Sequence, residues 1–452
     1  MLLSGRRLYL LLIVLAAGVC VFIPRPSRGV PGIQYSNEVI LPEQGNLFER
    51  PFFSTRRHPT IAYSDRPSTD VVGEFVRRVD SGAVRLQFQG SGGYLNSVLE
   101  GLHVPAETQS MVFSKTSLQS HYISPSNPRA IFFTDDISIA FVRNAPLLEI
   151  AALDPQQGIV FYALQNRNVE RPEIVRSDSC TSCHESHETM DVPGYLARSV
   201  GAGTGGETLE QFGTHVSDHR SPFEERWGGW FITGKTGTAR HMGNLMLPED
   251  SMPGRPNPVP LPLASLDGKF DLDGYPSHYS DVAAVLVLDH QVRMTNLMIR
   301  VGWEARVALD QAAKNPQDKV AANRVIASNA RDLADYMLFI DETTLPGKFE
   351  STSGFVTKFA ATGPLDKQGR SLRQLDLGKR LMRYPCSYMI YSPAFDALPG
   401  AARDAVYARM WDILSGKEKD RKYARLTAAD RSAIVGILLQ TKKDLPKYFH
   451  SI

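Results

Sequence analysis

The feature that most restricts this 452-residue chain is a run of five residues, Cys180-Thr181-Ser182-Cys183-His184. Two cysteines three positions apart, with a histidine directly after the second, have the C-x-x-C-H spacing of covalent c-type haem attachment. Each thiol can form a thioether with one haem vinyl group, and the imidazole can take one axial position on the iron. With 4 Cys and 11 His in the sequence, chance produces the pattern in roughly one of a thousand such chains. The motif therefore predicts one covalently bound haem c.

The motif resembles that of the c-type cytochromes, and the resemblance covers these five residues alone. It implies that Cys180 and Cys183 attach the haem and that His184 is an axial iron ligand. Small cytochromes of this class carry the motif near their N-terminus, whereas here a long unrelated segment precedes it. The single C-x-x-C-H also argues against the two-haem peroxidase type. The resemblance thus predicts the cofactor but leaves the fold and the sixth iron ligand open.

Two other interpretations of the motif remain open. A thioredoxin-like pair would place Cys180 and Cys183 at the strand-to-helix junction of a βαβ unit, but the preceding strand signals favour a meander. A zinc site could combine these thiols with His184 and His187, although structural zinc prefers two separated ligand pairs. Haem attachment is the favoured interpretation.

The N-terminus predicts export. Arg6 and Arg7 precede an uncharged apolar run over residues 8–23, which is typical of a secretory signal peptide or signal anchor. Positive charge on the short N-terminal side would leave the rest of the chain outside the cytoplasm. We expect residues 1–28 to be a signal peptide or membrane anchor. The protein would then lie in the bacterial periplasm or cell envelope, held at the inner membrane if the segment is not cleaved.

Charge and cysteine usage agree with a globular exported protein. A net charge of +2, from 50 basic and 48 acidic residues, gives no indication of a nucleic-acid partner. Outside the N-terminal segment, the one cysteine besides the motif pair is Cys386. No disulfide framework is therefore expected, and Cys386 is interpreted as a small buried hydrophobic residue.

Strand signals followed by helical periodicity predict an α+β fold. Four short β-prone runs separated by turn residues predict an N-terminal β-meander, at 130–133, 137–142, 147–153 and 159–164. A central loop-rich haem segment follows, rich in glycine and proline. Apolar periodicity beyond it predicts a C-terminal helical bundle.

The predicted helices cover 280–313, 320–339, 372–396, 402–414 and 427–441. Ser280 or Asp281 can cap the first of them, and Thr427 with Asp430 can form a capping box at the last. The predicted organisation is 29–75 tether, 76–170 β-rich domain, 171–278 loop-rich haem-binding region and 279–452 helical domain.

The sequence leaves the sixth iron ligand undecided, and that ligand decides the function, because a closed site carries electrons and an open site binds small molecules. Candidates for a sixth ligand or distal group are Met242, His241, Met252, His290 and His219. His219 lies in a chemically dense stretch, residues 215–230, that also contains Arg220, Arg226 and two tryptophans. These arginines could pair with haem propionates, the tryptophans could stack on the macrocycle, and His219 could act as a distal acid–base group.

Together, these patterns predict an exported mono-haem c-type cytochrome that binds haem and transfers electrons. Two alternatives remain: a haem-dependent redox enzyme, peroxidase-like or oxygenase-like, with an open distal site, and a haem sensor or partner-binding subunit. The length favours more than simple electron carriage, because about 100 residues suffice for that task. Neither the redox partner protein nor any substrate can be identified from the sequence.

Overall fold

The computed structural model describes residues 55–253, 260 and 262–452. The predicted export segment 1–28, and the predicted tether up to residue 54, lie outside the described residues. No helix in the described ranges is long and apolar enough to cross a membrane. All described residues belong to one unit of the chain.

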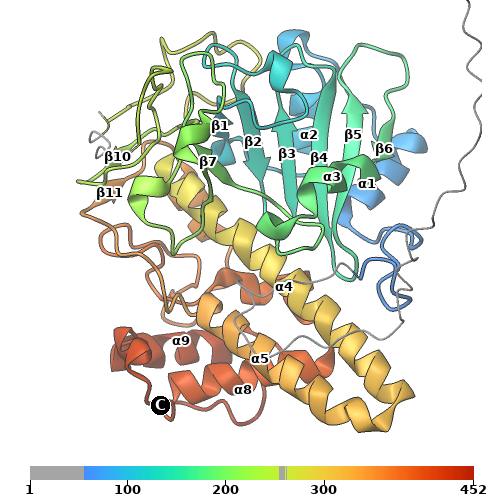
Figure 1. Ribbon diagram of the computed structural model, residues 1–452, viewed down its shortest axis with the longest axis vertical. Helices are drawn as coiled ribbons and strands as arrows, with labels where there is room; N and C mark the ends of the chain where they lie inside the picture. Colours follow the sequence, from blue (N-terminus) through green and yellow to red (C-terminus); the bar gives the residue numbers. More distant parts are fainter. Residues whose placement is uncertain (1–54, 254–259, 261) are drawn as a thin grey trace, which may run out of the picture. The chain divides into compact units, whose positions relative to one another are not determined.

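An antiparallel sheet forms the first half of the fold (Figure 1). Among the described residues it has seven strands in the order β6-β5-β4-β3-β2-β1-β9. Their bounds are β1 Ser110–Val112, β2 Arg129–Phe133, β3 Ile137–Phe141, β4 Leu147–Asp154, β5 Gly158–Gln165, β6 Ile174–Arg176 and β9 Trp230–Phe231. Strands β2 to β6 pair consecutively, which confirms the predicted meander.

Two small sheets accompany the main one. They pair β7 (Arg198–Val200) with β8 (Thr214–Val216), and β10 (Lys235–Thr236) with β11 (Phe349–Glu350). The second pair joins the central loop-rich region to the C-terminal half of the chain. The combination of this sheet region and C-terminal helices confirms the α+β prediction.

Both faces of the main sheet are covered, and strand alternation explains how. On β3, Ile139 and Phe141 pack in one apolar core with helices α1 (Val71–Asp80) and α2 (Leu95–Gly101). Ser138 and Ala140 point to the opposite face, since successive strand residues alternate between faces. That opposite face meets the segment with the C-x-x-C-H motif and a long helix.

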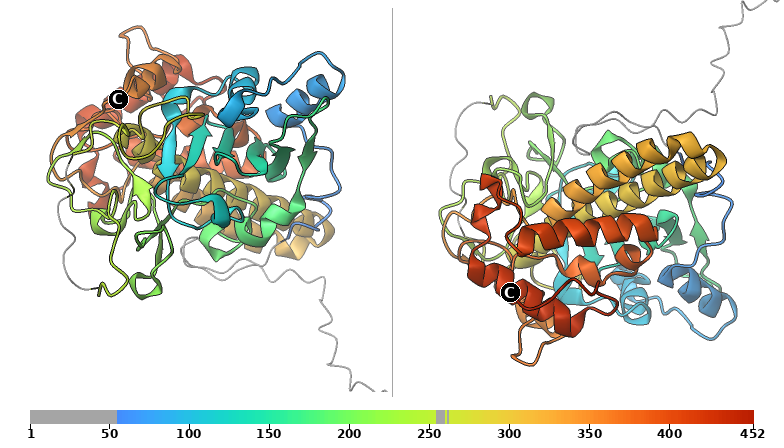
Figure 2. Two further views of the ribbon diagram at one scale, coloured as in Figure 1. Left: turned by 90° about the horizontal axis from the view of Figure 1, so that it is seen from above. Right: turned by 90° about the horizontal axis from the view of Figure 1, so that it is seen from below.

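This long helix is α4 (Val282–Lys314), and the other C-terminal helices pack around it. Helix α5 (Lys319–Met337) contacts both α4 and α8 (Gly400–Leu414), and α8 contacts α9 (Ala428–Thr441). Figure 2 shows α4 and α5 running side by side. Asp281 caps α4 by accepting from the Ala283 N–H, and Thr427 with Asp430 forms the capping box of α9. Both capping predictions are confirmed.

The predicted helix over 372–396 is wrong. The segment is mostly turns and ends in a 3₁₀ turn, Tyr388–Tyr391, and a short helix, α7 (Pro393–Asp396). Pro385 lacks an N–H and disfavours helical geometry in the residue before it. Ser387 and Ser392 then cap the two short pieces, so the apolar periodicity never becomes one continuous helix. Cys386 is fully buried, as expected for a small hydrophobic residue.

Helix α4 is buried around its whole circumference from Val282 to Ala305, polar residues included. Arg300 Nε donates to Glu304 Oε1 over 2.9 Å, and Asn329 of α5 donates to Glu304 Oε2 over 2.9 Å. Buried polar groups are tolerated when they are hydrogen-bonded to one another. Here they fix how α4 meets its neighbours.

Candidate functional site

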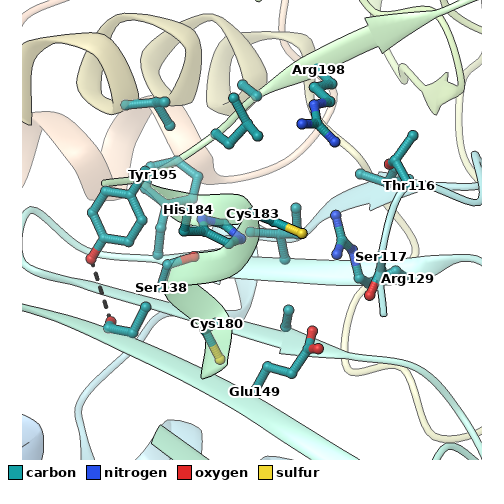
Figure 3. Close-up of a pocket in the computed structure, with 18 of the residues that line it drawn as sticks. Thr116, Ser117, Arg129, Ser138, Glu149, Cys180, Cys183, His184, Tyr195 and Arg198 are labelled. Carbon is teal, nitrogen blue, oxygen red and sulfur yellow. Dashed lines mark hydrogen bonds between the residues drawn. The ribbon is translucent and has the colours of Figure 1, made fainter. Parts of the chain in front are cut away.

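The C-x-x-C-H motif opens onto a cavity of about 400 Å³ between the main sheet, the segment after the motif and α4. Cys180, Cys183 and His184 all line it, and Figure 3 shows them together at its wall. Ligand pockets in proteins usually measure roughly 300–1,000 Å³. The motif therefore lies beside a space large enough for a cofactor.

Small side chains keep this space open. Ser138 and Ala140 of β3, Ala151 of β4 and Ala197 line the cavity, and none of them extends far from its backbone. Larger apolar side chains also line it, among them Ile131, Phe133, Phe161, Trp230, Leu288 and Val292. A predominantly apolar site with a few polar groups fits the body of a flat macrocycle.

The local fold delivers the motif to the cavity on a short helix. After β6, a 3₁₀ turn leads into α3 (Thr181–His184). Thr181 Oγ1 donates to the Asp178 carbonyl over 2.7 Å, and Arg56 donates to Thr181 Oγ1 and to Glu185. Cys180 is half-buried and Cys183 is exposed, and both are free thiols. Both sulfur atoms are thus available for thioether bonds.

The hydrogen bond of His184 prepares its ring for metal binding. His184 Nδ1 lies 2.9 Å from the carbonyl oxygen of Gly194. Since a carbonyl only accepts, Nδ1 carries the hydrogen and Nε2 keeps its lone pair. Burial lowers the pKa of His184, which favours the neutral ring that a metal requires. Such a second hydrogen bond is usual for histidine ligands and holds the orientation of the ring.

Helix α4 holds the segment of Gly194, the hydrogen-bond partner of His184, in place. Asn296 accepts from the Tyr195 N–H and donates to the Tyr195 carbonyl, each over 2.8 Å. Gly194 lies against the same amide, and a Cβ there would come within 2.4 Å of Asn296 Oδ1. Only glycine fits at this position without a shift. A buried residue of the helical half therefore supports the predicted iron ligand.

Four charged residues that were not anticipated from the sequence line the cavity: Lys115, and also Arg129, Glu149 and Arg198, which Figure 3 labels. Arg198 forms an ion pair with Glu188. Burial lowers the pKa of Arg129 and raises the pKa of Glu149, while their mutual attraction opposes both shifts. The one available signal was that Glu149 is charged inside the otherwise apolar run at 147–153.

None of the five candidates for a sixth iron ligand or distal group lines the cavity. Met252 is 74% exposed, and Met242 is buried beside Ser199 Oγ. His241 packs edge-on against Trp227. Among the described residues that line the cavity, His184 is the one histidine and there is no methionine.

His219 and His290 instead bind each other elsewhere in the core. Their Nδ1 atoms lie 2.7 Å apart, and His290 Nε2 lies 2.8 Å from Ser387 Oγ. Both rings stack on Tyr336 and Phe339. Burial lowers the pKa of His290 to about 3, so the ring is neutral. This pair joins α4 to α5 and to the loop at residue 219.

The dense stretch at 215–230 is divided between two places. Trp230 lines the cavity, whereas Arg220, Arg226 and Trp227 do not. Arg226 donates to the carbonyls of His219 and Ser221, and Trp227 Nε1 donates to Asp289 over 2.9 Å. The arginines that face the cavity come from β2 and β7 instead.

Asp289 provides a pH-dependent prediction. Burial raises its pKa to about 7, against the attraction of Arg226. Because the folded protein holds the Asp289 proton more tightly than the unfolded chain does, this group stabilises the fold at pH values below its unfolded pKa. That stability is lost as the pH rises through the folded pKa of about 7. Between pH 4 and 7.5, wild type should therefore lose up to about 4 kcal/mol of unfolding free energy relative to Asp289→Asn. Urea unfolding at several pH values measures this difference.

The exposed Asp65→Asn serves as the control for that experiment. We expect its unfolding free energy to follow that of wild type at every pH. Parallel profiles for wild type and Asp289→Asn would show that Asp289 does not titrate in this range.

No family model, curated protein or solved structure matches the chain. In the part of the chain that the structure describes, no three His, Cys, Asp or Glu side chains are grouped as metal ligands. The functional assignment therefore rests on the geometry around Cys180, Cys183 and His184.

Proposed function

We propose that the protein is an exported mono-haem c-type cytochrome, with its haem bound in the cavity beside α3 and exchanging electrons with a partner protein. The observation that carries the proposal is the position of Cys180, Cys183 and His184 on the wall of one cofactor-sized cavity. The fixed tautomer of His184, with Nε2 available, supports the same assignment. The two thiols would attach the haem, and His184 would bind its iron.

When bound, the haem supplies one-electron chemistry, and the chain supplies its surroundings. The apolar side chains of the sheet and α4 would face the bound haem and limit its contact with water. Arg129 and Arg198 can balance the negative charge of haem carboxylates. Because Cys183 is exposed, the attachment edge is accessible from the surface, as electron exchange with a partner requires.

A haem-dependent redox enzyme or sensor is the second candidate, and one observation favours it. No methionine and no second histidine lines the cavity within the described ranges. An iron bound by His184 alone would keep a position open for a small molecule. Glu149 and Arg129 then supply a carboxyl group and a cation inside the same cavity.

A pyridine haemochrome spectrum tests the main proposal. The protein is exported in a host with haem-maturation machinery, and we expect one haem c per chain. Cys386→Ser should give the same spectrum, because Cys386 is buried and does not line the cavity. A protein without covalent haem would contradict the proposal and reopen the thiol and zinc interpretations.

A carbon monoxide difference spectrum of the same sample separates the two candidates. If the second candidate is right, the iron position that the cavity lining leaves open binds carbon monoxide and the spectrum changes. No response would indicate a closed, six-coordinate electron carrier. A clear response would direct the work to turnover assays, which separate an enzyme from a sensor.

A further inference from the structure

Arg129 is an unusual arginine for the wall of an apolar cavity. It stands at the start of β2, and its Nε atom is buried without a hydrogen-bond partner. Its guanidinium forms no ion pair with any carboxylate of the described chain, whereas Arg198 on the same cavity is paired with Glu188. A half-buried cation without an ion-pair partner is unfavourable, because its buried Nε atom loses hydration and the charge gains no opposite charge in return.

Glu149 does not fully balance this charge. It faces Arg129 from β4, but beyond ion-pair distance among the described residues. Burial raises the pKa of Glu149, which favours its neutral form. Lys115, an exposed residue that also lines the cavity, adds a cation to those of Arg129 and Arg198. The cavity therefore has an excess of positive charge that the described residues do not neutralise.

Hydroxyl groups accompany the cation. Thr116 and Ser117 line the cavity, and in Figure 3 they lie on the same side as Arg129, opposite Tyr195. Ser117 Oγ accepts from the Gln119 N–H over 3.1 Å, so its hydrogen can turn towards the cavity. A guanidinium with neighbouring hydroxyl donors matches the planar oxygens of a carboxylate or another small oxyanion.

We propose that Arg129, with Thr116 and Ser117, binds a carboxylate or small oxyanion that the chain itself does not supply. The inference rests on the proposed haem site, because it assigns this anion a place in the same cavity. The shared chemistry has two sources: a carboxylate side chain of the haem, or a free oxyanion that enters the cavity. The experiment below distinguishes these sources.

The experiment compares haem-loaded wild type with Arg129→Gln and Arg129→Lys. The control is Arg167→Gln, which removes an exposed arginine that does not line the cavity. Covalent attachment keeps the haem in place in every variant, so differences between the variants do not arise from loss of haem. Each protein is examined by resonance Raman spectroscopy, in the bending band of the haem carboxylates, and by absorbance titration of the reduced protein with nitrite under saturating carbon monoxide, which occupies any open position on the iron.

If a haem carboxylate is the anion, the Raman band shifts in Arg129→Gln, and Arg129→Lys recovers part of the shift. Nitrite then has no effect on any variant. If a free oxyanion binds, nitrite changes the wild-type absorbance in a saturable way, and its affinity falls at least tenfold in Arg129→Gln. The proposal is overturned if Arg129→Gln matches wild type and Arg167→Gln in both measurements.

Failure of the haem proposal would be recognised separately. A negative pyridine haemochrome spectrum would remove the haem carboxylate as a source. Nitrite binding could still be followed in that protein through the NMR signal of the Arg129 Nε–H. A signal that does not move with nitrite would then overturn the anion site as well.

Discussion

Replacing both Cys180 and Cys183 with serine is expected to abolish covalent haem attachment. Thioether bonds require the two sulfur atoms, and serine oxygen does not replace them. We expect acid–acetone extraction to remove all haem from the double variant and none from wild type. The pyridine haemochrome spectrum of the protein residue measures what remains. Haem that resists extraction from the double variant would contradict the assignment of the motif.

The fold should survive this double substitution. Cys180 is half-buried and Cys183 is exposed, so serine replaces neither of them in a sealed core. Far-ultraviolet circular dichroism of the double variant should therefore match that of Cys386→Ser, the control that leaves the motif intact. A single Cys183→Ser variant should keep one thioether through Cys180, with a haemochrome band displaced from the wild-type position.

Replacing Glu304 with alanine is expected to lower the free energy of unfolding by about 3–5 kcal/mol. Glu304 accepts from Arg300 and from Asn329, and the Arg300 and Glu304 side chains are almost completely buried. Removal of the carboxylate takes away the acceptor of Arg300 Nε, 2.9 Å away, inside the core. Urea unfolding of the variant and wild type at one pH measures the difference.

Helix α4 supplies a matched control for this prediction. Asp310 and Lys314 form a second ion pair with the same spacing, but the lysine is exposed. Asp310→Ala should therefore change the unfolding free energy by less than about 1 kcal/mol. If Glu304→Ala and Asp310→Ala lowered the free energy of unfolding equally, burial would not be the reason that the Arg300–Glu304 pair stabilises the fold.

Features that depend on residues close together in the sequence were predictable. The meander from β2 to β5 follows from short apolar runs between turns, and the N-cap of α4 follows from Asp281 before an apolar periodic segment. The predicted helix over 372–396 failed for a local reason as well, since Pro385 and Pro393 interrupt a pattern that periodicity alone extends.

The surroundings of the motif were not predictable. His219 and His290 were candidate haem partners, but the fold brings them together and away from the cavity. Glu149 lay inside a predicted strand and Arg129 directly before one, and the pairing of β2, β3 and β4 places both on the cavity face. Their importance depends on which face of the sheet meets α3, and no local pattern records that.

The sequence by itself determined the C-x-x-C-H motif, the class of fold and the ends of the main helices, because spacing, capping and periodicity act over a few residues. Only the tertiary structure decided the cavity, its charged lining and the support of His184 by Gly194 and Asn296. The contact between Tyr195 and Asn296 joins residues 101 positions apart. These features follow from how the sheet packs on α4, and therefore from contacts that only the folded chain makes.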